Sequence, residues 1–341
     1  MAHRFISDLR AGERIDHQVF LIRSKDLRNT TQGSLYIHAV LADRSGQLVA
    51  RMWQASEEIF NYLPEGGFVG LKGRVEAYKG NPQFIIEAVR PADPETYDVA
   101  DYLASTKQDI DQMWHRTEAI MRSVKQPDLK RLMDEFLADE ALMTAFRKAP
   151  AAAVMHHAYV GGLLEHTLSL LEIAEKVIPM YPKLSLDLVL CGLFLHDIGK
   201  SKELEYEAAI SYSDEGQLLG HITQAVMMVE AKAHQVAEKT GQPFPKELLW
   251  VVQHIILSHH GRYEFGSPKL PAVPEAVAIH YLDNLDAKVN MYLAEIENDR
   301  DAASRWTNYN RALESKVYKI DPTGTRTKAT DEAKQESGRG S

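Results

Sequence analysis

Seven of the histidine and aspartate residues from position 166 to position 283 are spaced like the ligands of a buried metal site, and most of them are set in apolar runs of sequence. His196 and Asp197, for example, follow Leu193-Phe194-Leu195 and precede Ile198. A buried imidazole or carboxylate without a partner is costly, so such positions need a compensating interaction, and metal coordination would supply it. The candidate metal ligands are His166, His196, Asp197, His221, His259, His260 and Asp283.

The composition of this ligand set indicates the kind of ion. A set rich in imidazole favours Mn²⁺, Fe²⁺, Co²⁺ or Zn²⁺ over the ions that prefer oxygen ligands alone. Two such ions about 3.5 to 4 Å apart can share a carboxylate and a hydroxide that attacks a phosphate ester. Asp197 is the natural bridging carboxylate.

Lys200 follows His196 by four residues and therefore lies on the same helical face. We expect it to bind a substrate phosphate, and the alternative is a solvated lysine at a helix end.

Several ligand assignments have alternatives. For His221 the alternative is a capping or hydrogen-bonding role, and one residue of the pair His259-His260 has substrate contact as its alternative. Asp286 competes with Asp283 for the last ligand position because the two lie three residues apart on one helical face; we favour Asp283. His156-His157 are as compatible with a structural role as with the lining of the pocket.

Size and composition describe a globular chain of two ordinary domains: 341 residues, 45% hydrophobic and 26% charged. No apolar stretch has the roughly 18 to 20 uncharged residues of a membrane span, and the N-terminus lacks a signal-peptide core, so we expect a cytoplasmic protein with no membrane partner. The single cysteine, Cys191, excludes an intrachain disulfide framework and a cysteine-rich zinc site. The net charge of -9 argues against non-specific coating of nucleic acid, but not against a local basic groove.

The sequence pattern changes from short strands to helices near residue 92. Alternating strands are predicted over 15–22, 35–42, 48–53, 68–78 and 83–89, with a helix over 56–63. This is the element order of an OB-fold, whose open barrel face commonly binds oligonucleotides. Helical periodicity then dominates, with helices predicted over 110–124, 129–137, 141–147, 156–177, 184–195, 220–240, 246–258 and 274–298.

The predicted fold is therefore multidomain: an N-terminal all-β OB-fold barrel followed by an all-α domain. We place the barrel at residues 10–92, a helical linker region at 93–150, the metal-binding helical domain at 151–320 and a polar, disordered tail at 321–341. Single-strand binding requires aromatic side chains for base stacking and cations for phosphates. In the barrel the candidates are Tyr36, Arg51, Trp53, Tyr78 and Lys79, although an aromatic residue in a strand is more often part of the core.

His166, His196-Asp197 and Asp283 resemble the defining ligands of the HD-domain metal-dependent phosphohydrolases, an all-helical superfamily. With His221 and His259-His260 included, the ligand set resembles that of the binuclear version, the HD-GYP cyclic-dinucleotide phosphodiesterases. The chain departs from that version in having Gly266-Ser267-Pro268 where the family has Gly-Tyr-Pro, and in carrying a barrel before the helical domain.

The combination of barrel and helical domain resembles the YhaM-type 3′–5′ exoribonucleases from about residue 10 to about residue 320. The motifs that carry this resemblance are Gly161–Thr167, His196–Lys200, Ser258–Gly261 and Tyr281–Lys288. It implies release of nucleoside monophosphates from the 3′ end of single-stranded RNA, with single-stranded DNA as a second substrate, Mn²⁺ as the favoured ion, and a homo-oligomeric state. The alternatives are a phosphohydrolase of a nucleotide or cyclic dinucleotide with a regulatory barrel, and a non-catalytic nucleic-acid-binding factor.

Overall fold

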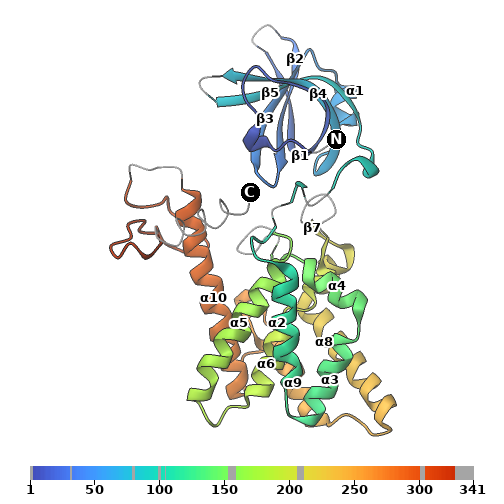
Figure 1. Ribbon diagram of the computed structural model, residues 1–341, viewed down its shortest axis with the longest axis vertical. Helices are drawn as coiled ribbons and strands as arrows, with labels where there is room; N and C mark the ends of the chain where they lie inside the picture. Colours follow the sequence, from blue (N-terminus) through green and yellow to red (C-terminus); the bar gives the residue numbers. More distant parts are fainter. Residues whose placement is uncertain are drawn as a thin grey trace. The chain divides into compact units, whose positions relative to one another are not determined.

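The computed structural model describes residues 3–30, 33–78, 81–98, 101–103, 105–152, 159–205, 211–299 and 304–326. The chain divides into two compact units, Met1–Leu282 and Asp283–Ser341. The first unit contains a β-barrel and an assembly of helices, and the last helix, α10, passes from the first unit into the second (Figure 1).

The barrel is closed and has the strand order β1-β2-β3-β5-β4, with β3 and β5 parallel and the other pairs antiparallel. The one helix between its third and fourth strands completes the predicted element order, so the OB-fold is confirmed. Its elements are β1 (Arg14–Asn29), β2 (Leu35–Asp43), β3 (Gly46–Trp53), α1 (Glu57–Tyr62), β4 (Gly67–Tyr78) and β5 (Asn81–Pro91).

Strand β1 is longer than the sequence pattern predicts, because it does not end at Ile22. A register shift between Ile22 and Ser24 bends the strand, and pairing with β2 then continues to Asn29 opposite Leu35. Bulges of this kind let one strand serve two parts of a barrel. The barrel interior is filled by fully buried side chains, among them Phe20 and Phe84, whose ring centroids are 5.4 Å apart.

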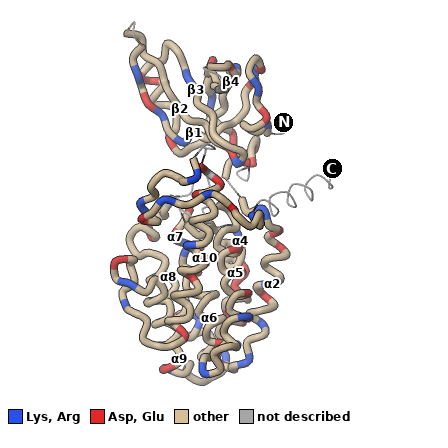
Figure 2. The backbone as a smooth tube through the Cα atoms, turned by 90° about the vertical axis from the view of Figure 1, so that its left-hand side faces the viewer, with Lys and Arg blue, Asp and Glu red and all other residues tan. Residues whose placement is uncertain are grey.

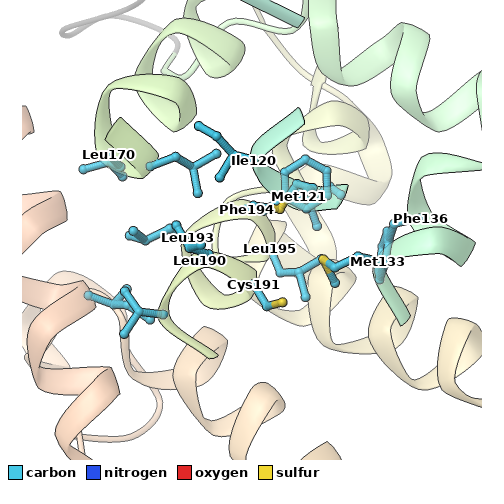
Figure 3. Packing of buried hydrophobic residues seen from close by; sticks show 14 of the residues in the cluster. Ile120, Met121, Met133, Phe136, Leu170, Leu190, Cys191, Leu193, Phe194 and Leu195 are labelled. Atoms are coloured by element: carbon cyan, nitrogen blue, oxygen red, sulfur yellow. The ribbon is translucent and has the colours of Figure 1, made fainter. Parts of the chain in front are cut away.

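The helical part surrounds α6, which is buried along nearly its whole length. Every residue from Leu188 to Leu195 is buried, and Figure 3 shows this helix between side chains of other helices, including Met121, Phe136 and Leu170. Burial strongly raises the pKa of the Cys191 thiol, which argues against a nucleophilic role for it. The helices are α2 (Ile110–Arg122), α3 (Pro127–Leu137), α4 (Glu140–Lys148), α5 (Gly162–Val177), α6 (Leu186–Leu195), α7 (Lys200–Glu203), α8 (Asp214–Thr240), α9 (Lys246–Ser258) and α10 (Pro274–Asn298).

Three local features differ from the predicted pattern. Helix α8 begins at Asp214 rather than Gly220, and it breaks at Gly220, where φ is 70° and ψ is 156°. A small hairpin, β6 (Leu204–Glu205) with β7 (Ser211–Tyr212), precedes α8. The predicted disorder of the tail does not extend to residues 321–326, because the Asp321 carboxylate accepts backbone hydrogen bonds from Gly324 and Arg326; later residues lie outside those described.

Charged residues do not segregate into one acidic and one basic half of the chain. Figure 2 shows lysine and arginine interspersed with aspartate and glutamate along the helices. Among the described residues, no helix is both long enough and apolar enough to cross a membrane. The cytoplasmic location stays a prediction.

The barrel depends on a close backbone approach at Gly73. A Cβ atom there would lie 2.0 Å from the Ile85 carbonyl oxygen and 2.9 Å from the Phe84 ring. We expect Gly73→Ala to lower the free energy of unfolding by about 1–3 kcal/mol, because a paired strand has little freedom to move away. Denaturant unfolding would measure the loss. Arg23→Ala, at an exposed position of β1, is the control and should change stability by less than about 0.5 kcal/mol; equal effects would contradict the interpretation.

Candidate metal centre and nucleic-acid interface

Four helices or helix ends bring six of the seven candidate ligands together. His166 lies one turn into α5, His196 and Asp197 follow the last residue of α6, and His221 follows the break in α8. His259 and His260 follow the last residue of α9. Each position is thus set by where a helix begins, breaks or ends.

The ligand atoms form two groups, and within each group all of these atoms lie within 4.8 Å of one another. One group is His166, His196 and Asp197, and the other is His221, His259 and His260. Ring centroids of His196 and His259 are 5.0 Å apart, so the groups adjoin. Asp197 connects them, since its Oδ2 is 3.4 Å from His196 Nε2 and its Oδ1 is 3.4 Å from His221 Nε2 and 3.6 Å from His259 Nε2.

Asp197 is 4% exposed and stays ionised in this setting. Burial by itself would raise the pKa of its carboxyl. The Lys200 ammonium, 2.7 Å from Oδ2, and the imidazoles of His196 and His221 outweigh burial and hold that pKa well below its usual range. The centre therefore offers an anionic carboxylate between two groups of imidazoles.

The Nδ1 atoms of three histidines are fixed by backbone carbonyls. His196 Nδ1 lies 2.7 Å from the Leu193 oxygen and His259 Nδ1 lies 2.8 Å from the Ile256 oxygen; both carbonyls belong to the last turn of a helix. His260 Nδ1 lies 2.7 Å from the carbonyl oxygen of Phe265, the last residue of the short 3-10 helix Tyr263–Phe265. Because a carbonyl only accepts, Nδ1 carries the hydrogen, and Nε2 is left with the lone pair that a metal requires.

His221 is fixed by a carboxylate rather than by a carbonyl. Glu203 Oε1 accepts hydrogen bonds from the His221 backbone N–H at 2.9 Å and from its Nδ1 at 3.1 Å. Glu203 is 7% exposed, and although burial opposes ionisation, the hydrogen bonds from His221 hold its pKa below the usual value. The result is a carboxylate–histidine pair with Nε2 directed at Asp197, an arrangement typical of metal-bound histidine.

Three glycines permit this convergence. A Cβ at Gly199 would lie 2.1 Å from the His221 carbonyl oxygen, and one at Gly261 would lie 2.3 Å from the His280 ring. Gly220 takes the positive φ that turns the His221 backbone N–H toward Glu203. Larger residues at these positions would separate the segments that carry the ligands.

The residues present fit a divalent transition metal. Among the described side chains, His196 Nε2, His221 Nε2 and Asp197 Oδ1 are buried and have no hydrogen-bond partner of acceptable geometry. Orphaned polar atoms are rare in native interiors, and coordination would satisfy all three. Imidazole and carboxylate together suit a borderline ion better than Mg²⁺ or Ca²⁺.

Lys200 lies at the centre, but it is not on the same helix as His196, contrary to the prediction from the sequence spacing, because a turn separates the two residues. Helix α6 ends at Leu195, and α7 begins at Lys200. Its ammonium donates to Asp197 Oδ2 at 2.7 Å. Lys200 therefore neutralises the Asp197 carboxylate in this structure, and its predicted contact with a phosphate stays a prediction.

Other predicted residues are not part of these two groups. Asp283 and Asp286 lie on α10 in the second unit, where Asp286 is buried and Asp283 is half-buried, so the choice between them as a ligand stays open. His156, His157 and Lys79 lie outside the described residues.

Glu203 and His280 also take part in the centre, and Glu203 was not among the residues predicted from the sequence. Its segment, Lys200 to Glu203, carries no periodic pattern that singles it out. His280 Nδ1 lies 2.8 Å from the His259 carbonyl oxygen and so holds the end of α9. His280 thus supports the segment that carries a ligand.

On the barrel, the four described members of the predicted nucleic-acid-binding set share one outer surface. Tyr36 on β2 pairs with Trp53 on β3, and their ring centroids are 5.1 Å apart. The Arg51 guanidinium lies 4.8 Å from the centroid of the Tyr78 ring and 5.8 Å from that of Trp53. Trp53 is 45% and Tyr78 47% exposed, so these two rings are not core residues. A cation between exposed aromatic rings is suited to contact bases and phosphates.

Comparison with known protein families matches both parts of the chain. Residues 163–288 match the HD domain, and residues 21–92 match the OB-fold nucleic acid binding domain. The HD match includes all seven candidate ligands and begins at the second residue of α5.

Curated relatives resemble the chain over most of its length. The 3′-5′ exoribonuclease YhaM of Bacillus subtilis (strain 168) is 35% identical over 310 residues, which covers 90% of this chain and 95% of the relative. The protein of the same name from Geobacillus sp. (strain WCH70) is 34% identical and covers 90% and 92%. That from Halalkalibacterium halodurans is 33% identical and covers 82% and 85%.

The bond between Glu203 and His221 generates a prediction for metal binding. Glu203→Ala should weaken Mn²⁺ binding by about 10- to 100-fold, because it releases the ring that Glu203 orients. Glu203→Gln keeps one acceptor oxygen, so its Mn²⁺ affinity should lie between that of Glu203→Ala and that of the parent protein. Equilibrium dialysis measures the affinity, and Glu215→Ala, at an exposed position of α8, is the control. Unchanged affinity in a folded Glu203→Ala protein would refute the role.

Proposed function

The chain belongs to the family of YhaM 3′–5′ exoribonucleases, and from that premise we propose that it releases nucleoside monophosphates from the 3′ end of single-stranded RNA with two divalent ions. It is a hydrolase with an HD domain and an OB-fold that binds single-stranded nucleic acid. The proposal extends to single-stranded DNA as a second substrate and to Mn²⁺ as the favoured ion.

The observation that supports two ions is the position of Asp197. Its two oxygens face different groups of imidazoles, at 3.4 Å from His196 and 3.4 Å from His221. One ion needs three or four protein ligands, and each group provides three residues, with Asp197 available to both. Asp283 is the proposed further ligand, by its match to the HD motif.

Divalent ions held there would neutralise the phosphate and activate water for attack on phosphorus. The protein's own groups determine where this takes place. Glu203 and the backbone carbonyls of α6 and α9 hold the imidazoles in fixed orientations before substrate binds. The Lys200 ammonium, which donates to Asp197 in this structure, can donate to a phosphate oxygen instead when substrate is present. It would then bind the scissile phosphate as a point charge.

The barrel is proposed to hold the strand whose 3′ end is cut. Arg51, Trp53 and Tyr78 offer a cation between two exposed rings, which recognises bases without regard to sequence. Tyr36 extends this surface beside Trp53, and Lys79 is proposed as a further phosphate contact from the sequence. An enzyme that removes successive nucleotides benefits from such tolerance.

Replacing the bridging carboxylate tests the metal centre. Asp197→Ala should reduce Mn²⁺-dependent release of nucleoside monophosphates by more than about 100-fold. Mutation of a residue that only hydrogen-bonds a metal ligand already lowers metal affinity or activity by about 10- to 100-fold, and Asp197 is itself a proposed ligand. Affinity for single-stranded RNA in EDTA should stay within about twofold of the parent protein, because the barrel is unchanged. Chromatography of products from 3′-labelled and 5′-labelled RNA reports direction as well as rate. Substantial remaining activity would refute the assignment.

Replacing the exposed tryptophan tests the barrel. Trp53→Ala should weaken binding of single-stranded RNA about tenfold through loss of stacking. Tyr62→Ala, which removes another exposed barrel aromatic, on α1, is the matched control and should leave affinity unchanged. Fluorescence anisotropy in EDTA gives both affinities. Equal losses in the two variants would argue against a specific surface at Trp53.

A further inference from the structure

The second unit carries a groove of about 620 Å³ that the proposed mechanism does not use. We call it the C-terminal groove; it lies between α10 and the C-terminal hairpin, residues 304–319. Three of its lining side chains are aromatic and solvent-exposed: Tyr292 is 39%, Trp306 51% and Tyr318 41% exposed. Exposed aromatic rings that share one groove require a functional explanation.

The charges of the C-terminal groove are of one sign. Lys288, Lys316 and Arg326 line it, and none of the described residues that line it is acidic. The nearby carboxylates are occupied: Glu295 accepts a hydrogen bond from Asn310 at 2.7 Å, and Asp299 lies 3.4 Å from the Lys319 ammonium. Arg326 also lies 4.0 Å from the Asp321 carboxylate, so the positive charge of the groove comes mainly from Lys288 and Lys316, beside the aromatic rings.

The sequence that forms much of this groove is positively charged, whereas the chain as a whole is negatively charged. Residues 304–326 contain five cationic side chains and two carboxylates, a net charge of +3 in a chain of net charge -9. The cations alternate with aromatic residues, from Arg305-Trp306 to Val317-Tyr318-Lys319. A basic stretch interleaved with aromatic residues is typical of single-strand binding surfaces.

The C-terminal hairpin holds its aromatic rings in place. Trp306 and Tyr318 face each other across an antiparallel bridge, with ring centroids 4.9 Å apart. The Thr307 N–H donates to the Val317 carbonyl at 2.9 Å, and Val317 is 3% exposed. Rings fixed in this way lose little conformational entropy when a base stacks on them.

We propose that the C-terminal groove is a second binding site for single-stranded RNA, separate from the metal centre and from the barrel surface. The inference rests on the proposed function, because it assigns the groove to the same substrate. The negative charge of a polyanion complements Lys288 and Lys316, and its bases can stack on the aromatic rings. A second copy of the chain fits less well, because a symmetric self-interface would place lysines of both copies near one another, and lysine is depleted at protein interfaces.

The test measures binding of a fluorescein-labelled uridine oligonucleotide to the full chain in EDTA, by anisotropy. Trp306→Ala should weaken binding about tenfold, and Trp306→Phe should retain most of the affinity because the stacking surface remains. Lys316→Ala should reduce the slope of log Kd against log salt by about 0.7, the value for one phosphate contact on a single strand. Trp250→Ala is the matched control, since Trp250 is 54% exposed and lies 4.7 Å from the Lys246 ammonium.

Hydrolysis of a trinucleotide with Mn²⁺ separates this inference from the proposed function. Trp306→Ala should cut the trinucleotide at the parental rate while binding the long strand less well. Parental affinity for the long strand in both Trp306→Ala and Lys316→Ala would overturn the inference and leave the proposed function intact. A smaller mass of Trp306→Ala in sedimentation, with unchanged RNA affinity, would identify the groove as a protein interface and also overturn it. Failure of the parent protein to cut any RNA would instead refute the proposed function.

Discussion

A histidine placed just past the end of an apolar helix, with Nδ1–H donating to a carbonyl of the last turn, is the interaction on which the metal centre depends. His196 ends α6 in this way and His259 ends α9, and the two bonds are 2.7 and 2.8 Å long. The last carbonyls of a helix have no partner within it, so one bond caps the helix and orients the ring. Both Nε2 atoms then lie within 3.6 Å of the Asp197 carboxylate.

This arrangement explains why the centre tolerates so much buried polarity. Helix α6 supplies the apolar packing, with every residue from Leu188 to Leu195 buried, and its end supplies the ligands. Asp197 is ionised because Lys200 and the imidazoles surround it, and the orphaned atoms that remain point at one another. An interior that concentrates unsatisfied lone pairs in one place is organised for a cation rather than for stability alone.

The two surfaces proposed to bind substrate differ in chemistry from the metal centre. The barrel offers Arg51 between Trp53 and Tyr78, and the C-terminal groove offers Trp306 and Tyr318 beside lysines. Both surfaces combine aromatic rings with cations, whereas along the helices lysine and arginine are interspersed with aspartate and glutamate (Figure 2). Local positive charge can therefore bind RNA despite the acidic whole.

The sequence by itself determined the two fold types, and it predicted the histidines and Asp197 that the structure brings together. Strand alternation, helical periodicity and polar residues in apolar runs are local signals. The sequence also predicted Arg51, Trp53 and Tyr78 as nucleic-acid contacts, and the structure places these three side chains near one another. Only the tertiary structure decided that Glu203 orients His221, that Asp197 lies between the two histidine groups, and that α8 breaks at Gly220. These depend on contacts between segments distant in the sequence, and no local pattern encodes a distance between two helix ends.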